Sequence, residues 1–542
     1  MRSLILALCA ALVVLPACKK ADPNSIEDQV EVLKKGKTTK IKIKAVENLR
    51  NIGKKEAVPG LIEALKDSNS QVKLEIARVL GELKDPSAIQ GLADAIDYSV
   101  GGGSDKMTQD ANAANKEIAR ALGDLGDKGA VKPLLKLLKV TKDNYVRIET
   151  IGSLGRLKDS TAVEQLSEVA TDERLETFIN KKAILALAEI NDPAALPAYM
   201  RMLFAERKGV SFYPESAFGI FLLGDAANDT ILSVLKDENK ELLTWAEERK
   251  VLKPAIYAKA AQIESDLQDR RSIPYLLKLL GYDDANIAYK LFVRMAAADS
   301  LGRMRAKEAI GPISKMLDEE EANTRGAYVR SLVQIGDKSV VAKLADCSQK
   351  GSWSAREFCM LGLALLGGEP EIKRLEAFAN GEEKLFMKEC EEGYYGEVDC
   401  AAEKAKNVEA RTKTIATYKK VLETIAACKE GDDKCLESAL THAEPVVRER
   451  AAYELGRRMA AGSLPALFAA IKRPVSDVVD LNPRFAAICA IDWITSGNPS
   501  AMAQAKPEAR GLEAQVEEEN KKTITMKIAE EVKRLAVKLN RG

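Results

Sequence analysis

Apolar residues recur along most of this chain at helical spacing, in units that each predict two short helices. In the segment ARVLGELKDPSAIQGLADAI (77–96), Ala77, Leu80 and Leu83 recur at three-residue steps and predict one face of a first helix. In the second half of the segment, Leu92 and Ile96 continue an apolar stripe at the spacing of a second helix. Closely similar phrases begin at residues 119 and 150. The chain is therefore built from an internal repeat.

A short residue, usually Asp, separates the two helices of each unit. Asp85 precedes Pro86, an arrangement typical of an N-cap followed by proline at the first helical position. Most successive anchors lie 31 to 33 residues apart, and the longer steps of 37, 42 and 44 residues indicate insertions. The aligned anchors are Lys54, Asp85, Asp127, Asp159, Asp192, Asp225, Asp269, Ala306, Asp337 and Gly368. A repeat of this size cannot bury its own apolar face, so neighbouring copies must stack.

These units resemble HEAT repeats, of the short bacterial kind also found in phycobilin lyases. The resemblance extends from about Ser25 to Leu375 and resumes around residues 452–470 and 488–503. It implies an all-α fold, a right-handed superhelical solenoid of stacked antiparallel helix pairs. The family implies a protein-binding surface in general and chromophore attachment in one branch only. The composition, 46% hydrophobic but 5% aromatic, suits a long, thin helical core.

The repeat spacing also gives the expected domain boundaries. The main array is expected at 26–375, with about ten repeats and insertions near 98–115, 204–216 and 236–256. The flanking segments are expected to be a signal peptide at 1–17, a tether at 18–25, an irregular helical block at 376–442, further repeats at 443–510 and a C-terminal capping helix at 511–542.

The N-terminus resembles a bacterial lipoprotein signal. Arg2 precedes an apolar stretch, Ser3–Leu15, that is too short to span a bilayer, and the sequence Leu-Pro-Ala-Cys then ends at Cys18. The resemblance implies cleavage before Cys18 and lipidation of its thiol and amino group. Two or three acyl chains hold a protein stably at a membrane. Ordinary secretion after a different cut and a coincidental apolar start are the alternatives.

The expected location is the periplasmic side of the bacterial outer membrane. Lys19 stands where Asp would, by resemblance to enteric lipoproteins, signal retention at the inner membrane. The inner membrane and the cell surface are the alternatives. With 82 basic and 81 acidic residues, the chain is a poor candidate for binding nucleic acid.

Basic residues cluster close behind the predicted anchor. Between Lys34 and Lys55 there are nine Lys or Arg residues and one acidic residue, Glu47. Such a cluster favours contact with anionic headgroups, and the alternative is a solvated face of a terminal helix. The candidate membrane-facing residues are Lys34, Lys35, Lys37, Lys40, Lys42 and Lys44.

The cysteines fit an oxidising compartment. The stretch from Cys400 to Cys428 has no Gly or Pro and predicts one helix, whose ends lie roughly 40 Å apart at 1.5 Å per residue. A disulfide needs Cα atoms within about 7 Å, so each of these two cysteines must pair at its own end, which also argues against a four-cysteine zinc site. The predicted disulfides are Cys390–Cys400, Cys428–Cys435 and Cys347–Cys359, with Cys489 as a buried small hydrophobe.

Aromatic residues gather in the middle of the array. Residues 199–292 make up about 17% of the chain but hold 12 of its 27 aromatics. Aromatics on irregular loops suit a recognition surface, and the alternative is that they fill gaps between irregular repeats. The candidate partner-binding residues are Phe212, Tyr213, Trp245 and Tyr282.

The sequence offers few residues or motifs that are typical of catalysis. The single histidine, His442, cannot build a multi-histidine metal site, and no phosphate-binding or nucleophile motif lies beside a plausible strand. The sequence therefore predicts a non-enzymatic, monomeric envelope scaffold that binds a protein partner and has no cofactor, metal or nucleic acid. A ligand or glycan carrier that uses the aromatic middle region is the alternative, and a lyase-type enzyme is the remote one.

Overall fold

Each repeat folds as two helices joined by a tight turn, and the predicted anchor lies at that turn. The Asp85 carboxylate accepts a hydrogen bond from the Ser87 N–H at 3.0 Å, and Asp159 accepts one from Thr161 at 2.9 Å. One short 3₁₀ turn follows each of these anchors and leads directly into the second helix. The Asp therefore satisfies a backbone donor that the start of the helix leaves free, as its position in the sequence predicts.

The residue before the anchor ends the first helix in a left-handed conformation. Lys84, Lys158 and Asn191 take φ values of 49°, 50° and 56°, and Gly126 occupies the same place with φ 70°. This conformation closes the helix and reverses the chain. The repeat accepts Lys, Gln and Arg here as well as Gly, so the helix ends could not be read from glycine alone.

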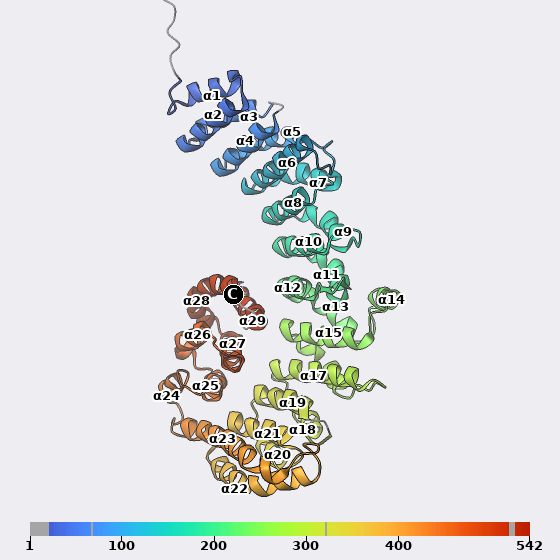
Figure 1. The fold of residues 1–542 in the computed structure, drawn as a ribbon, viewed down its shortest axis with the longest axis vertical. Coiled ribbons are helices and arrows are strands. Elements are labelled where there is room, and N and C mark those ends of the chain that lie inside the picture. The colour runs from blue at the N-terminus through green and yellow to red at the C-terminus, as the bar shows by residue number, and fades with distance from the viewer. Residues whose placement is uncertain (1–20, 67–68, 320–321, 520–525, 542) are drawn as a thin grey trace, which may run out of the picture. The chain divides into compact units, whose positions relative to one another are not determined.

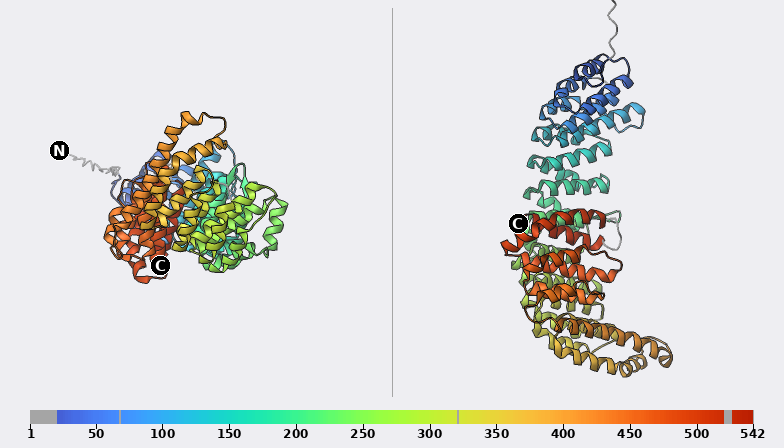
Figure 2. Two further views of the ribbon diagram at one scale, coloured as in Figure 1. Left: turned by 90° about the horizontal axis from the view of Figure 1, so that it is seen from below. Right: turned by 90° about the vertical axis from the view of Figure 1, so that its left-hand side faces the viewer.

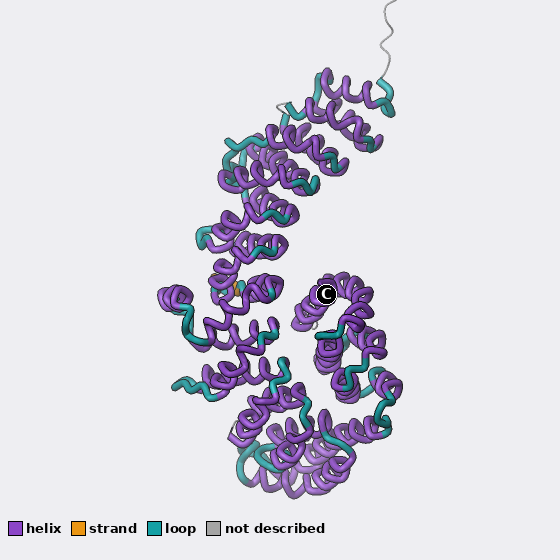
Figure 3. The backbone as a smooth tube through the Cα atoms, turned by 180° about the vertical axis from the view of Figure 1, so that it is seen from behind, coloured by secondary structure: helices purple, strands orange, loops and turns teal. Residues whose placement is uncertain are grey.

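The computed structural model describes residues 21–66, 69–319, 322–519 and 526–541. The chain divides into unit 1, which ends at Leu223, and unit 2, which begins at Gly224. Helices dominate both units (Figure 3). The predicted all-α solenoid is confirmed.

Unit 1 consists of two layers of helices, and the first helices of successive repeats pack against one another (Figure 1). The helices of unit 1 are α1 (Ile26–Lys35), α2 (Thr39–Ile52), α3 (Val58–Ala64), α4 (Ser70–Leu83), α5 (Ile89–Ala95), α6 (Lys106–Asp124), α7 (Val131–Val140), α8 (Asn144–Leu157), α9 (Val163–Thr171), α10 (Thr177–Ile190), α11 (Leu196–Phe204) and α12 (Tyr213–Leu223). The 3₁₀ turns of unit 1 are Lys55–Ala57, Pro86–Ala88, Lys128–Ala130, Ser160–Ala162 and Pro193–Ala195. We call α2, α4, α6, α8, α10 and α12 the first-helix layer of unit 1.

Small residues let the first helices approach closely. A Cβ atom built on Gly155 would lie 3.0 Å from the Cα of Ala186 on the next repeat, and one on Gly81 would lie 3.1 Å from the Cα of Ala121. Real Cβ atoms are rarely so close to backbone, so the glycine of the ARxLG phrase is required by helix packing.

The insertion predicted at 204–216 contains a short hairpin that the sequence did not predict. Strands β1 (Glu206–Arg207) and β2 (Val210–Ser211) pair antiparallel. Gly209, with φ 73°, lies in the turn between them. Arg207 holds the hairpin to the neighbouring repeat because its guanidinium donates to the Asn180 side chain at 2.6 Å.

Unit 2 contains more repeats, then a long helical hairpin, then repeats again. Its helices are α13 (Asp225–Leu235), α14 (Lys240–Glu248), α15 (Lys253–Leu267), α16 (Ile273–Leu280), α17 (Ile287–Arg303), α18 (Ile310–Glu319), α19 (Ala322–Ile335), α20 (Val341–Cys347), α21 (Trp353–Leu366), α22 (Glu369–Glu391), α23 (Cys400–Ala426), α24 (Asp433–Ala439), α25 (Pro445–Arg457), α26 (Leu464–Lys472), α27 (Leu481–Thr495), α28 (Pro499–Glu519) and α29 (Met526–Arg541). Its 3₁₀ turns are Arg270–Ser272, Lys307–Ala309, Lys338–Val340, Ala461–Ser463 and Val478–Asp480.

Two predicted anchors differ from the others. Asp225 opens the second helix of its repeat, α13, as predicted, but it does so directly after Gly224 (φ 57°) and without a 3₁₀ turn. Gly368 precedes α22, a helix of 23 residues that is too long to be the second helix of a repeat. Gly368 therefore marks the start of the irregular block.

Two predicted boundaries also need correction. The boundary at 375/376 falls inside α22, so the irregular block begins at Glu369. The boundary at 511 falls inside α28, and the C-terminal segment forms the end of α28 followed by α29. The apolar spacing in 511–542 is helical throughout, so periodicity alone could not separate the two helices. The signal peptide and Cys18 lie outside the described residues.

Candidate functional site

The structure separates the four predicted aromatic contact residues. Phe212 is only 1% exposed, so the prediction that it contacts a partner is wrong. It follows the β1–β2 hairpin, and that turn directs its ring into the core of unit 1. Tyr213 is half-buried at the start of α12.

The other two aromatic candidates lie in unit 2. Trp245 is half-buried, and the Arg249 guanidinium lies 5.0 Å from its ring centre. The Tyr282 ring packs edge-on against Tyr257 at 5.9 Å, and its hydroxyl donates to Asp284 at 3.0 Å. Their neighbours within unit 2 explain these rings, which supports the gap-filling alternative.

Three of the six candidate membrane-facing lysines pair with carboxylates of α1–α3. Lys37 and Lys40 are exposed and Lys42 is half-buried. Membrane contact stays a prediction that rests mainly on Lys37 and Lys40. The pairs are Lys34 with Glu63, Lys35 with Glu31 and Lys44 with Glu47.

The cysteines lie as the predicted pairing requires. The Cα atoms are 5.8 Å apart in Cys347–Cys359, 5.8 Å in Cys390–Cys400 and 5.4 Å in Cys428–Cys435. Helix α23 keeps Cys400 and Cys428 at opposite ends, and Cys489 is buried and unpaired. The geometry agrees with the pairing, and the oxidised state stays a prediction.

We expect reduction to destabilise the region from α20 to α24. Each pair closes a loop of 7 to 12 residues, and a loop of that length stabilises a fold by about 2–3 kcal/mol in the chain-entropy model. The midpoint of denaturation should therefore fall in dithiothreitol. Non-reducing peptide mapping should find these three links, and a link between Cys400 and Cys428 would contradict both the pairing and the single helix α23.

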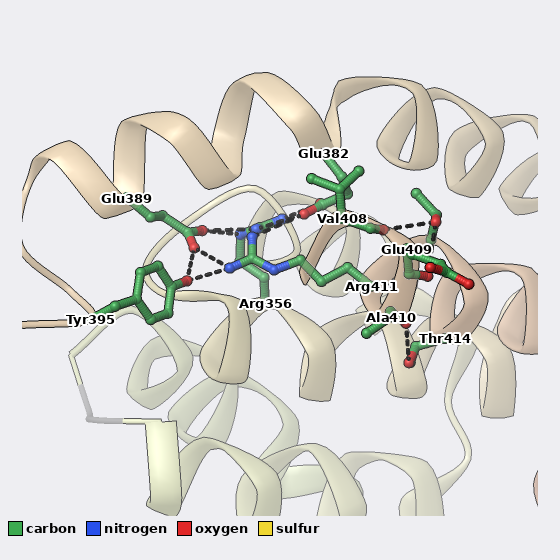
Figure 4. A network of polar contacts seen from close by, with 10 residues as sticks. Arg356, Glu382, Glu389, Tyr395, Val408, Glu409, Ala410, Arg411 and Thr414 are labelled. Atoms are coloured by element: carbon green, nitrogen blue, oxygen red, sulfur yellow. Dashed lines mark hydrogen bonds and ion pairs between the residues drawn. The ribbon is translucent and has the colours of Figure 1, made fainter. Parts of the chain in front are cut away.

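A network of buried charges joins the α22–α23 hairpin to α21 (Figure 4). The Arg356 guanidinium donates to Glu382 at 2.6 Å and to Glu389 at 2.8 Å. Arg411 donates to the same two carboxylates at 3.3 and 2.9 Å, and Tyr395 donates to Glu389. The charges pair with one another, so the network is a structural junction between three helices.

Aromatic rings enclose the Arg411 guanidinium. Its centre lies 5.1 Å from the ring of Trp353, 5.0 Å from Phe386 and 5.6 Å from Tyr395. Cations are attracted to the faces of such rings, most strongly where water is excluded. Figure 2 shows the α22–α23 hairpin extending beyond the neighbouring helices of unit 2, and this junction fixes it there.

We expect the junction to weaken in acid. Burial alone would raise the pKa of Glu389, but Tyr395, Arg356 and Arg411 together lower it. A carboxyl group with a lowered pKa stabilises the fold above its unfolded pKa and stops doing so as the pH falls through its folded pKa. Thermal unfolding should therefore occur at a lower temperature as the pH falls from about 5 to 3. An Arg356→Met variant should show a shallower pH dependence, and an equal slope in both proteins would contradict this assignment.

Charged residues form a row along the first-helix layer of unit 1. The row occupies the position three residues before each anchor, which is exposed in four successive repeats. Asp124 on α6 and Arg156 on α8 form an ion pair of 3.5 Å between neighbouring helices, and their side chains are 39% and 40% exposed. The members of the row are Glu82, Asp124, Arg156 and Glu189.

The same position is covered in unit 2. Asp266 on α15 and Arg303 on α17 form an equivalent pair of 3.4 Å, but their side chains are only 4% and 20% exposed. Helix α29 covers them, because Glu531 accepts from Arg303 at 2.8 Å and Arg534 lies 3.3 Å from Asp266. The C-terminal repeats of unit 2 therefore pack against its own first helices.

Helix α25 makes further polar contacts between the C-terminal repeats and the first helices of unit 2. The Arg457 guanidinium donates to the carbonyl oxygens of Val333 at 2.8 Å and Leu365 at 3.4 Å, in the last turns of α19 and α21. Helix C-termini carry unpaired carbonyls and partial negative charge, which a guanidinium satisfies. Arg330 of α19 donates to Glu449 of α25 at 2.9 Å. Polar contacts thus link α25 and α29 to the first helices of unit 2.

Sequence reasoning missed both charged pairs and the buried network. A signal was present for the pairs, since Asp and Arg replace each other three residues before successive anchors in an otherwise apolar phrase. No group of His, Cys, Asp or Glu in the described ranges is arranged to hold a metal ion. Nor does any helix in those ranges have the length and apolar character needed to cross a membrane.

Comparison with known proteins agrees with this repeat architecture. A family model described as HEAT repeats matches residues 26–101, 106–179 and 292–364. The chain contains HEAT repeats. The matches fall in both units, and they concern the fold of the HEAT repeats without specifying an activity. No curated protein matches the sequence.

Several solved structures resemble the chain at low sequence identity. Human deoxyhypusine hydroxylase in complex with glycerol is 17% identical, with a TM-score of 0.22, over 58% of this chain and 96% of that one. Kap121p bound to Pho4p is 12% identical, with a TM-score of 0.49, over 95% of this chain and 60% of that one. Importin beta is 11% identical, with a TM-score of 0.42, over 92% and 70%. The HEAT-repeat chain thus spans about 60% of the length of Kap121p.

Proposed function

We propose that this HEAT-repeat protein is a non-enzymatic, lipid-anchored scaffold of the bacterial cell envelope that binds a protein partner through the first-helix layer of unit 1. One observation carries the proposal. The charged row of unit 1 is exposed, whereas the equivalent positions of unit 2 are covered by the chain's own helices. Solenoids use such extended layers to bind other proteins.

Exposed aromatic residues extend this surface. Tyr145 and Phe178 are 72% and 50% exposed in the first turns of α8 and α10. Each lies eleven residues before a member of the charged row, Arg156 or Glu189, which is three helical turns and therefore the same face. Large exposed apolar side chains beside polar groups are typical of interaction sites.

Photo-crosslinking in intact cells tests the protein-binding function. A crosslinking amino acid at Phe178 should capture a partner protein reproducibly. The same amino acid at the exposed Lys132 should not, because Lys132 lies on α7, the second helix of its repeat. Equal capture at both positions, or capture at neither, would contradict binding through the first-helix layer.

The proposed envelope location rests on the resemblance at Cys18. In a Gram-negative host, a Cys18→Ala variant should lose incorporation of labelled palmitate and move from the membrane fraction to the soluble periplasm. Retention of the variant in the membrane fraction would contradict lipid anchoring and leave the protein-binding test unaffected.

A further inference from the structure

The two units contain the same acidic–basic pair at the same place in consecutive repeats. Asp124 and Arg156 lie three residues before the anchors Asp127 and Asp159. Asp266 and Arg303 lie three residues before the anchors at residues 269 and 306. The ion pairs have almost equal lengths, 3.5 Å in unit 1 and 3.4 Å in unit 2.

In unit 2 a helix completes this pair. Glu531 and Arg534 of α29 lie three residues apart on one face of the helix and contact each other at 3.5 Å. Glu531 pairs with Arg303, and Arg534 pairs with Asp266. The four side chains form a closed ring in which each charge has two opposite neighbours.

The apolar residues of α29 lie on the side of the helix next to this ring. Ile528, Val532 and Leu535 are buried, and α29 packs against α27 and α28. The helix therefore presents its charged face to α15 and α17 while its apolar face belongs to the core of the C-terminal repeats. A helix needs only a Glu and an Arg at i and i+3 to match the pair.

We propose that the Asp124–Arg156 pair of unit 1 binds a partner helix that carries Glu and Arg three residues apart, in the way that α29 binds Asp266–Arg303. The inference rests on the proposed function and names the chemistry of its partner. The partner's Glu pairs with Arg156 and its Arg with Asp124. Arg156 also pairs with Glu149 of its own helix at 3.2 Å. The side chains of Asp124 and Arg156 are nevertheless 39% and 40% exposed, so a further opposite charge can reach each of them.

The first turns of α8 and α10 supply the apolar part of this site. Tyr145 lies three turns from Arg156, about 16 Å along α8, and Phe178 occupies the corresponding position on the neighbouring helix α10. A partner helix of about four turns covers both the aromatic and the charged ends. Charge order sets its direction, because Glu and Arg must face Arg156 and Asp124 respectively.

A reciprocal charge exchange tests the site. The probe is a lactam-bridged, fluorescein-labelled peptide of residues 526–541, and its control carries Glu531→Arg and Arg534→Glu. By fluorescence anisotropy, the full-length protein should bind the probe about fivefold more tightly than the control, the factor expected for two exposed ion pairs. An Asp124→Arg, Arg156→Asp variant should reverse this preference.

The outcomes separate the site from the wider function. A preference that does not reverse in the exchanged variant, or no preference in either protein, overturns the proposed pairing. If the Phe178 crosslink still captures a partner in that case, the scaffold function stands and only this inference fails. If the crosslinked peptide contains Glu and Arg three residues apart and the exchanged variant loses it, the site is established in cells.

Discussion

An Arg356→Met variant is expected to lower the free energy of unfolding of unit 2 by about 3–5 kcal/mol. Arg356 is 1% exposed, and its partners Glu382 and Glu389 are 0% and 7% exposed. Its removal leaves two buried carboxylates with Arg411 as the one cation of the network, and a buried charge without enough partners is strongly destabilising. Chemical denaturation followed by fluorescence measures the effect at the junction itself, provided that Trp245 and Trp493 are replaced by Phe in both proteins so that Trp353 alone reports.

A matched control lies on the same two helices of the hairpin. Lys404 on α23 pairs with Glu383 on α22 at 2.9 Å, but these side chains are 40% and 66% exposed. A Lys404→Met variant should cost no more than about 0.5 kcal/mol, because water solvates both charges. An equal loss of free energy of unfolding in the Arg356→Met and Lys404→Met variants would show that burial does not decide the strength of these contacts.

An Arg303→Met variant is expected to detach α29 from α15 and α17, with a loss of about 3 kcal/mol. Arg303 pairs with Asp266 and Glu531, and burial already raises the pKa values of Asp266 and Asp299 beside it. Without the guanidinium, Asp266 and Glu531 share one cation, Arg534. Hydrogen exchange should become faster in α29, between Met526 and Arg541.

Unit 1 supplies the control for this variant at the same register. An Arg156→Met variant removes the equivalent arginine from an exposed pair and should change stability by no more than about 0.5 kcal/mol. It should leave hydrogen exchange in α29 unchanged. If both arginines prove equally important for stability, the covering of the unit 2 pair by α29 is not what makes Arg303 matter.

Local features of the fold could be predicted from the sequence. Asp85 and Asp159 mark their turns because a helix start needs an acceptor within two or three residues. The continuous helix α23 and the cysteine positions at its ends followed from the absence of Gly and Pro and from simple length. Cys489 is buried as predicted.

The candidate site depends on contacts that leave no local pattern. Arg303 and Glu531 are 228 residues apart, so no window of sequence shows that they meet. Phe212 belongs to a loop by composition, yet a two-residue hairpin turns it into the core. Arg356 lies on a helix that reads as apolar, and only the tertiary structure shows the two glutamates that balance its charge.

The closure of unit 2 has a consequence for the order in which the protein folds. In unit 1, helices contact their sequence neighbours, so each repeat has its partners as soon as the next one is made. In unit 2, α15 and α17 lack their final partners until Glu531 and Arg534 are present. Contacts over such separations form slowly. Unit 1 is therefore able to mature while the rest of the chain is still being made, whereas unit 2 reaches its native state only after nearly the whole chain is present.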